Sequence, residues 1–424
     1  MRIAIVTCSS RIAGGAESYL DTVIPMLEAA GHEIALLCET DVPSSARAIG
    51  LATDAPVWCI AELGAPGALE SMRQWRPELV YSQGLVDPEL EAQAVAMAPS
   101  IVFAHDYRSI CVSGSKTLSF PGSTPCTRRL GTGCAVNFYP RRCGGLNPLT
   151  LLTDFRDASR RLAMLRKAGA VLVASEYVRT EYLRNGLSPA VVRCVGLPIV
   201  DRGGVSSITS KIRADGQNGV PLRLVFAGRM EPPKGGAMLL DALPTIAATL
   251  ARPVVATFAG DGRARFAWTR RANAIVRMHP QLRVEFTGWL DLVALNALLD
   301  RADLLVMPSL WPEPFGLVGP EAGLRGLPAA AFAVGGIPEW LTDGVNGALA
   351  RGPRSAKSLA DAVLRCLRDP AEHARLRCGA IGEAKRFSPA IHFKALMNVI
   401  DSLVPHRMRD AVSGSDSDRK LSLR

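Results

Sequence analysis

The 424-residue sequence has no run of about 18 uncharged apolar residues, the length that a membrane-spanning helix needs. Its ten cysteines are too dilute for a disulfide scaffold. Aromatic residues make up only 6% and do not alternate with the basic pairs, which disfavours the stacking platforms of a nucleic-acid-binding protein. A hydrophobic content of 48% is too high for a disordered chain, and the length favours two domains.

Charge is distributed unevenly along the chain. The formal net charge is +10, but residues 1–100 carry 5 basic against 13 acidic side chains, a net of −8. Residues 101–200 carry 14 basic against 5 acidic side chains, a net of +9. A basic block of this kind is typical of contact with nucleic acid, an anionic membrane surface or phosphorylated substrates, or it is simply a solvated basic face.

The first eight residues hold one Arg and a very short apolar run. They predict a buried strand and not a secretory signal, whose apolar region is longer. We therefore expect a cytoplasmic protein, with thiols that are reduced.

Short runs rich in Val, Ile and Leu recur along the chain and predict buried parallel strands. They lie at 3–6, 34–37, 79–81, 101–103, 171–174, 222–227, 254–259, 284–287, 304–307 and 328–331. Amphipathic segments between them predict helices near 18–30, 237–250, 292–300, 320–325, 358–368 and 391–403. The fold class is therefore α/β, with two Rossmann-like doubly wound halves that face each other across a ligand-binding cleft.

The same pattern sets the predicted domain boundaries. Residues 1–200 form an acceptor-side domain with an insertion at 105–145, 201–220 a linker, and 221–387 a donor domain. A helix at 388–404 is expected to pack back on the first domain, and the polar tail at 405–424 is expected to be disordered.

The insertion has no periodic apolar pattern, and a structureless loop of this length is uncommon in a compact domain. It holds Cys111, Cys126, Cys134 and Cys143, with 14, 7 and 8 residues between successive members. That spacing is not the tight pairing of a zinc ribbon. A structural zinc site and a set of buried or free thiols both stay open.

In the second half, three segments follow predicted strands and carry groups that bind sugars and phosphates. Two pairs of residues, Gly228-Arg229 and Lys234-Gly235, lie just before a helix. Their glycines let the backbone approach a ligand closely, and Arg229 and Lys234 supply positive charge. This combination predicts a diphosphate site. Gly260-Asp261-Gly262 is a weaker glycine turn. Between Pro308 and Ala322, Glu313 and Glu321 have seven residues between them on a Pro- and Gly-rich loop entering a helix, where carboxylates can accept from sugar hydroxyls.

The first half offers two candidates. Gly14-Gly15 follows the first strand and opens a helix, but lacks the full dinucleotide-binding pattern of glycines. His105 comes directly after the strand at 101–103, at the edge of the sheet where ligands bind.

These residues together resemble the retaining nucleotide-sugar glycosyltransferases of the GT-B fold, in particular glycosyltransferase family 4, over about residues 1–404. The resemblance implies a catalytic set of Arg229, Lys234, Glu313 and His105, of which Arg229 and Lys234 would neutralise the leaving diphosphate. It also implies that Glu321 holds ribose hydroxyls and that Glu313 and His105 contact the transferred sugar. The implied donor-binding residues are Gly14, Gly15, Gly228, Gly260, Asp261, Phe315, Gly316, Leu317, Val318 and Glu321.

The resemblance implies transfer of a hexose-type sugar, with retention, from a nucleoside-diphosphate sugar to a glycan or lipid-linked acceptor in cell-surface polysaccharide or glycolipid biosynthesis. It implies no catalytic cofactor, and the basic block suits peripheral contact with the anionic inner face of the cell membrane. The alternatives are a non-catalytic sugar-nucleotide-binding relative and another GT-B enzyme such as a sugar-nucleotide epimerase. The stretch Val195–Ile199 departs from the family pattern, and many relatives are shorter where Cys111–Cys143 lies.

Overall fold

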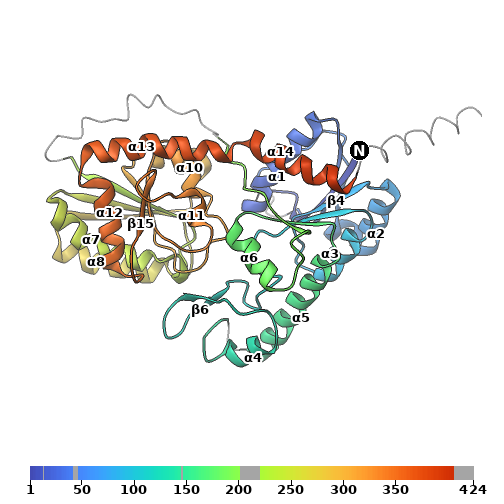
Figure 1. Ribbon diagram of the computed structural model, residues 1–424, viewed down its shortest axis with the longest axis horizontal. Coiled ribbons are helices and arrows are strands. Elements are labelled where there is room, and N and C mark those ends of the chain that lie inside the picture. Colours follow the sequence, from blue (N-terminus) through green and yellow to red (C-terminus); the bar gives the residue numbers. More distant parts are fainter. Residues whose placement is uncertain (13, 42–45, 145–146, 201–219, 405–424) are drawn as a thin grey trace, which may run out of the picture. The chain divides into compact units, whose positions relative to one another are not determined.

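The computed structural model describes residues 1–12, 14–41, 46–144, 147–200 and 220–404, and these divide between two compact units (Figure 1). Unit 1 comprises Met1–Ser115, Thr127–Pro198 and Pro389–Arg424, and unit 2 comprises Lys116–Cys126 and Ile199–Ser388. Of the predicted linker at 201–220 only residue 220 is described, and the predicted tail at 405–424 lies outside the described residues.

Unit 1 is built on a seven-stranded sheet with the order β3-β2-β1-β4-β5-β8-β9, in which every neighbouring pair is parallel. The strands are β1 Arg2–Ser9, β2 Glu33–Thr40, β3 Val57–Cys59, β4 Leu79–Ser82, β5 Ser100–Phe103, β8 Ala170–Val173 and β9 Val192–Cys194. The helices are α1 Gly15–Ala29, α2 Ile60–Trp75, α3 Pro88–Val95, α4 Thr132–Phe138, α5 Pro148–Leu165, α6 Glu176–Arg184 and α14 Pro389–Leu403.

Unit 2 is built on a six-stranded parallel sheet with the order β12-β11-β10-β13-β14-β15. Its strands are β10 Leu222–Ala227, β11 Val254–Ala259, β12 Leu282–Gly288, β13 Leu304–Met307, β14 Ala329–Phe332 and β15 Gly347–Ala350. Its helices are α7 Gly236–Leu250, α8 Arg265–Met278, α9 Leu292–Arg301, α10 Val318–Leu324, α11 Ile337–Trp340, α12 Ala356–Leu367 and α13 Pro370–Ala384, with 3₁₀ turns at Pro232–Lys234 and Lys385–Phe387.

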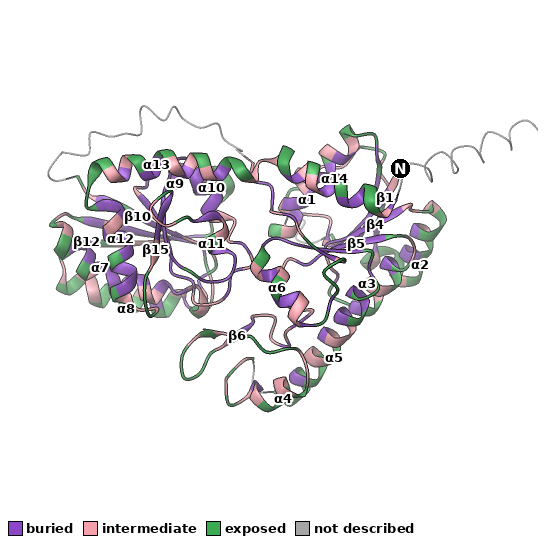
Figure 2. Ribbon diagram, in the orientation of Figure 1, coloured by how far each residue is buried: buried purple, intermediate pink, exposed green. Residues whose placement is uncertain are grey.

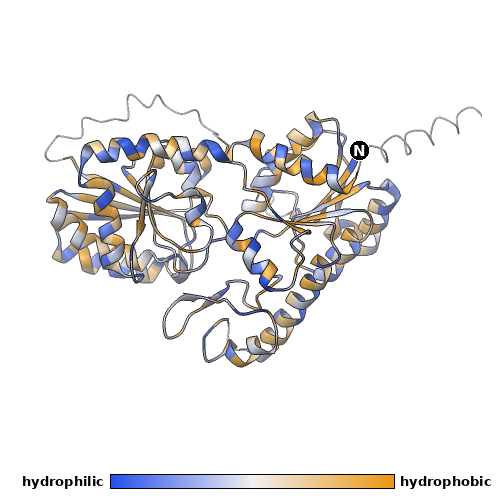
Figure 3. Cartoon of the chain, viewed as in Figure 1, coloured by the Kyte–Doolittle hydropathy of each residue, from blue (hydrophilic) through white to orange (hydrophobic). Residues whose placement is uncertain are grey.

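Burial explains why the central strands read as continuous apolar runs. Helices cover parallel sheets on both faces, so the side chains on both sides of a central strand are buried. Strands β4, β5, β8, β13 and β14 are buried at every position (Figure 2). In Figure 3 hydrophobic colours lie on strands of the sheets, while the helices alternate between hydrophobic and hydrophilic positions. The α/β expectation is confirmed for both units.

In each sheet the order of the strands reverses at one pair of neighbouring strands, and this switch point indicates where ligands are expected to bind. In unit 1 the chain runs outward from β1 to β3 and then returns to pair β4 with β1. In unit 2 it runs outward from β10 to β12 and returns to pair β13 with β10. Ligands of doubly wound sheets bind at the carboxyl ends of the strands next to such a switch point. The loops after β1, β4, β10 and β13 are therefore the positions to inspect.

The insertion contains more structure than its sequence suggests. Strands β6 Thr117–Leu118 and β7 Thr124–Pro125 form an antiparallel pair, and α4 follows. Within unit 1, Val112, Phe138 and Leu151 form a buried cluster against which Cys134 and Cys143 are partly buried. The sequence has no periodic apolar pattern here because the apolar residues of this cluster are too far apart in sequence to produce a local period.

Candidate functional site

The loop after β10 and the loop after β13 are locked together at the switch point of unit 2. Gly235 has φ +73°, and a Cβ atom there would lie 1.8 Å from the carbonyl oxygen of Pro308. The amide of Leu310 donates to the carbonyl of Pro233 at 2.7 Å. Only glycine allows so close a backbone approach together with a left-handed conformation. Gly235 therefore places the Lys234 side chain beside the loop after β13.

Lys234 and Glu313, both predicted from the sequence, form an ion pair in which Glu313 is buried and Lys234 is partly buried. The Lys234 ammonium donates to both carboxylate oxygens of Glu313, at 2.7 and 2.9 Å, and the Ser309 hydroxyl donates to Oε1 of Glu313 at 2.6 Å. The Glu313 side chain is 4% exposed and that of Lys234 is 21% exposed. The Lys234 ammonium also lies 5.2 Å from the centre of the Trp311 ring. A cation is thus fixed where the carboxyl ends of β10 and β13 meet.

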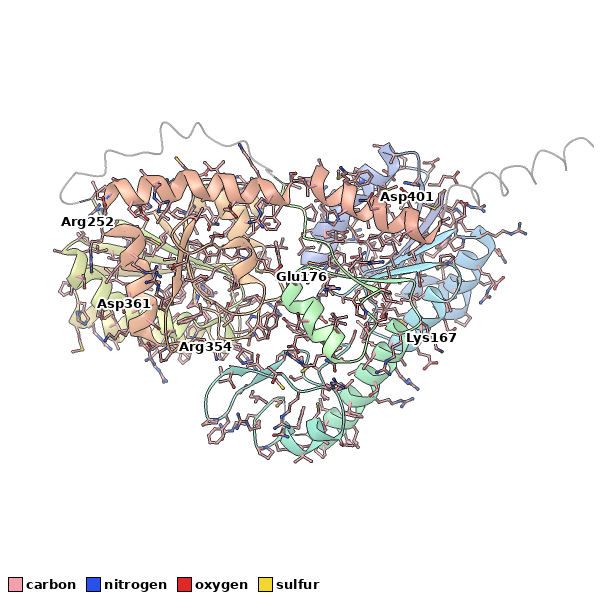
Figure 4. The ribbon with its side chains drawn as sticks, viewed as in Figure 1. Lys167, Glu176, Arg252, Arg354, Asp361 and Asp401 are labelled. Carbon is pink, nitrogen blue, oxygen red and sulfur yellow. The ribbon has the colours of Figure 1, made fainter. Side chains whose placement is uncertain are left out.

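The backbone of the loop after β13 is held from several sides. Gly336 donates its amide to the carbonyl of Glu313 at 2.7 Å, and the Trp340 indole donates to the carbonyl of Phe315 at 2.7 Å. Arg354 (Figure 4) donates to the carbonyl of Leu310 at 2.8 Å. These bonds satisfy carbonyls that an irregular loop leaves without partners from secondary structure. The backbone of this loop is therefore held in place by hydrogen bonds within unit 2.

The other predicted donor-binding residues of this loop lie around the start of α10. Phe315 is buried, Gly316 has φ +90°, and Leu317 and Val318 are half-buried as the helix begins. Glu321 is half-buried in the first turn of α10.

Arg229 and the glycine turns occupy the neighbouring strand ends. Arg229 is exposed directly after β10. Gly228 donates its amide to Ala259, and a Cβ atom on Gly260 would lie 2.1 Å from the carbonyl oxygen of Gly228. Gly228 and Gly260 thus let the ends of β10 and β11 approach closely.

The Asp261 carboxylate forms hydrogen bonds with residues close to it in the sequence. Its carboxylate accepts from the amide of Gly262 at 2.7 Å and from Arg265 at 2.6 Å. These two donors, the amide first, hold the pKa of Asp261 below its usual value.

In unit 1, His105 follows β5 and is held by two neighbours. Its ring stacks on Phe103, with centroids 4.4 Å apart and planes 10° apart, and its Nε2 shares a hydrogen bond with Oε1 of Gln83 at 2.7 Å. Burial lowers the pKa of His105 from 6.5 to about 4, so the ring is neutral at pH 7. His105 and Gln83 line a small pocket of unit 1 together with Asp106, Arg108 and Tyr182.

Gly14 and Gly15 are exposed after β1, where α1 begins.

Two residues of these sites were missed from the sequence, namely Ser309 and Gln83. Gln83 follows β4, so the rule that singled out His105 would have found it too. Nothing in the local sequence marks Ser309 as the second donor to Glu313.

The four cysteines of the insertion do not fit a zinc site as they are placed. Among the described residues, which include all four, no group of three or more His, Cys, Asp and Glu side chains is arranged to hold a metal ion. Cys111 lies against the Ser113 hydroxyl, Cys134 against the carbonyl of Arg129 and Cys143 against the carbonyl of Asn137. Cys134 and Cys143 pack on the apolar cluster of Val112, Phe138 and Leu151.

Comparison with known proteins shows the fold of the chain and a family that part of the chain resembles. The structure resembles that of HepE from Anabaena, solved in complex with UDP, with a TM-score of 0.65, 19% identity, and coverage of 95% of this chain and 100% of that one. It also resembles sucrose-phosphate synthase from Thermosynechococcus elongatus, with a TM-score of 0.66, 20% identity, and coverage of 95% and 99%. The chain therefore has the two Rossmann-like domains of the GT-B fold.

Residues 221–369, which lie in unit 2, match the family model "Glycosyl transferases group 1". Glycogen synthase of Mycobacterium tuberculosis is 36% identical over 173 residues, which are 41% of this chain and 40% of that protein. D-inositol 3-phosphate glycosyltransferase of Streptomyces griseus is 32% identical over 200 residues, 44% of this chain and 40% of that protein. These matches span about two-fifths of the relatives' length.

Proposed function

We propose that the protein is a retaining glycosyltransferase that moves a hexose-type sugar from a nucleoside-diphosphate sugar to a glycan or a lipid-linked saccharide. The observation that carries the proposal is the Lys234–Glu313 pair at the switch point of unit 2, inside the segment that matches the group 1 family. A fixed cation at the carboxyl ends of parallel strands suits a diphosphate. Structural neighbours solved with UDP and UDP-glucose support a nucleotide-sugar donor.

In this proposal Arg229 and Lys234 neutralise the diphosphate as the bond to the sugar breaks. Glu321 accepts hydrogen bonds from ribose hydroxyls, and Glu313 accepts from hydroxyls of the transferred sugar. Oε1 of Glu313 already accepts from both Lys234 and Ser309, whereas Oε2 accepts only from Lys234 among its side-chain partners, so Oε2 is the oxygen with a lone pair left for a sugar hydroxyl.

The proposed reaction draws its electrostatic stabilisation from protein cations and uses no metal cofactor. The exposed Arg229 and the fixed Lys234 supply two positive charges at one edge of the sheet. Turnover in the presence of a chelator tests this directly. Activity that survives EDTA is expected, and activity that EDTA abolishes and Mg²⁺ or Mn²⁺ restores contradicts this part of the proposal.

A donor screen tests the activity. Purified protein is incubated with UDP-, GDP- and ADP-sugars, and the thermal shift and donor hydrolysis are measured for wild type, Glu321→Ala and the matched control Glu372→Ala. Glu372 is a surface carboxylate on α13 that pairs with Arg375. At least one donor is expected to stabilise wild type and the control but not Glu321→Ala. If no donor stabilises wild type, or if Glu321→Ala responds equally, the site is wrongly assigned.

We also propose that unit 1 contacts an anionic membrane surface at the inner face of the cell membrane, where a lipid-linked acceptor would lie. No helix among the described residues is long and apolar enough to cross a bilayer. Residues 107–115 and 127–153 of unit 1 contain five Arg and no Asp or Glu. At the end of this stretch Val136 is 73% exposed on α4, and Leu149 and Leu152 are 68% and 66% exposed in the first turns of α5. Exposed apolar residues beside cations are typical of surfaces that bind acidic lipids.

Vesicle flotation tests this contact. Arg128→Glu/Arg129→Glu reverses two exposed charges next to α4, and Lys394→Glu on α14 serves as the control. The wild type and the control are expected to float with anionic vesicles at low salt and to be released as salt is raised, since about 1 kcal/mol per cation is electrostatic. Equal flotation of the double variant, or equal binding to neutral vesicles, contradicts the proposal.

A further inference from the structure

The two faces of the unit 2 sheet differ in how they are covered at β10, β11 and β12. These strands pair in register and place three aromatic side chains in one row, Phe226, Phe258 and Phe286. The Trp268 ring of α8 packs on this row, with its centroid 5.6 and 6.1 Å from those of Phe226 and Phe258. Successive side chains of a strand point to opposite faces. The preceding row therefore lies on the other face, and its members are Val225, Thr257 and Glu285.

Helix α9, which has ten residues, packs against this second face and covers it only in part. A cavity of about 310 Å³ lies between the helix and the strands. The row of Val225, Thr257 and Glu285 forms its floor, and Ala297 and Leu298 of α9 line one wall. We call this cavity the α9 groove. Its volume lies in the range of about 300–1,000 Å³ that is typical of pockets for small molecules.

The hydroxyl of Thr257 on the floor of the α9 groove points to a ligand. Thr257 is 6% exposed, yet its hydroxyl has no hydrogen-bond partner among the described residues. Polar groups buried to this extent are normally hydrogen-bonded. Beside it, Glu285 pairs with Arg283 at 2.7 Å and keeps 39% of its side chain exposed. The floor thus offers a hydroxyl that donates and accepts, next to a carboxylate that accepts.

Two arginines line the end of the α9 groove at which the strands begin. Arg223 is the second residue of β10, and its side chain is on the same face as Val225. Arg301 is the last residue of α9, which runs back from the end of β12 to the start of β13. Both arginines are exposed, and neither forms an ion pair with a described carboxylate. This end of the groove is therefore positively charged.

We propose that the α9 groove binds a sugar monophosphate, with the phosphate at Arg223 and Arg301 and the sugar hydroxyls at Thr257 and Glu285. Arginine binds phosphate oxygens through paired hydrogen bonds. Two residues along a strand separate the level of Arg223 from that of Thr257, a distance of about 7 Å, which a hexose 6-phosphate spans. The groove lies on a face of the sheet, whereas the proposed donor site lies beyond the carboxyl ends of β10 and β13. The inference therefore does not depend on the proposed function.

Isothermal titration calorimetry with hexose 6-phosphates tests the phosphate end. Glucose, mannose and galactose 6-phosphates are titrated into the full chain as wild type, Arg223→Ala, Arg301→Ala and the matched control Arg270→Ala. Arg270 is exposed on α8, which covers the opposite face of the sheet. At least one hexose phosphate is expected to bind wild type and the control alike and to bind each groove variant about tenfold more weakly. Binding of none of the three to wild type, or equal affinity for the groove variants, overturns the proposal.

Thr257→Val tests the sugar end. Valine keeps the shape of the side chain and removes only a hydroxyl that has no partner among the described residues, so the melting temperature is expected to equal or exceed that of wild type. Affinity for the hexose phosphate is expected to fall about fivefold, as loss of one hydrogen bond implies. Unchanged affinity, or a melting temperature below that of wild type, overturns the assignment of Thr257.

Arg229→Ala distinguishes the α9 groove from the donor site. A hexose phosphate in the groove is expected to bind this variant as it binds wild type. If affinity falls in Arg229→Ala and not in Arg223→Ala, the phosphate occupies the diphosphate site and the proposal is overturned. Failure of the proposed function would show in the donor screen and leave binding in the groove unchanged.

Discussion

The Lys234–Glu313 pair gives a stability prediction whose size follows from burial. Replacing Lys234 by Met leaves a carboxylate that is 4% exposed and that keeps, of its two side-chain donors, only the Ser309 hydroxyl. Breaking a buried pair from one side costs about 3–5 kcal/mol, and we take about 3 kcal/mol because Lys234 keeps a fifth of its surface in water. Glu313→Leu is expected to cost about as much, since it also removes the acceptor of the buried Ser309 hydroxyl.

Removing both charges together should cost far less than the two single changes combined. An apolar pair of similar volume often matches a buried ion pair in stability, so the double variant is expected to cost only about 1–3 kcal/mol, for the Ser309 hydroxyl that is left without its acceptor. Two single changes of about 3 kcal/mol each then give a coupling energy of about 3–5 kcal/mol. Urea unfolding followed by tryptophan fluorescence measures the cycle. The pair Arg271–Asp241, whose side chains are 50% and 32% exposed, is the control and should couple by less than about 1 kcal/mol. Additivity of the Lys234 and Glu313 changes within about 0.5 kcal/mol would refute the reasoning.

Three further predictions concern other parts of the chain. Gly235→Ala is expected to lower the melting temperature of unit 2 or prevent its folding, because the new Cβ would meet the Pro308 carbonyl at 1.8 Å; a melting temperature equal to wild type contradicts this. The unfolded chain takes up a proton at His392 near pH 6.5 and the folded chain near pH 4, so stability should fall by about 3 kcal/mol as pH falls through this window, and His392→Gln should remove that part of the slope in urea titrations. Elemental analysis is expected to find no stoichiometric zinc in wild type or Cys143→Ser, and zinc lost on this substitution would show that the thiols do gather.

The central strands could be predicted from sequence because their burial is local and complete. The predicted strands at 222–227, 254–259 and 304–307 coincide with β10, β11 and β13. The short edge strands β3, β9 and β15 were missed, since an edge of three or four residues leaves too little apolar pattern. The insertion itself was predicted, but its internal structure was not, because Val112, Phe138 and Leu151 form their cluster only through tertiary packing.

In the candidate site, too, some features could be predicted from the sequence and others could not. Residue types and their place after strands suggested Lys234 and Glu313, and doubly wound topology explains why they lie together at β10 and β13. The sequence could not show that Glu313 is enclosed by Lys234 and Ser309, because that depends on side-chain geometry across two loops. The roles of Arg229, Glu321 and His105 toward a donor stay predictions.

The central claim is that the switch point of unit 2 binds a nucleoside diphosphate, and isothermal titration calorimetry tests it most directly. UDP, GDP and ADP are titrated into wild type, Arg229→Ala and Arg277→Ala. Arg277 is an exposed control in the last turn of α8, at the amino end of the strands and away from the switch point. At least one nucleotide is expected to bind wild type and Arg277→Ala alike and to bind Arg229→Ala about tenfold more weakly, as loss of one charged hydrogen bond implies. Binding of none of the three to wild type, or equal affinity for Arg229→Ala, would contradict the account.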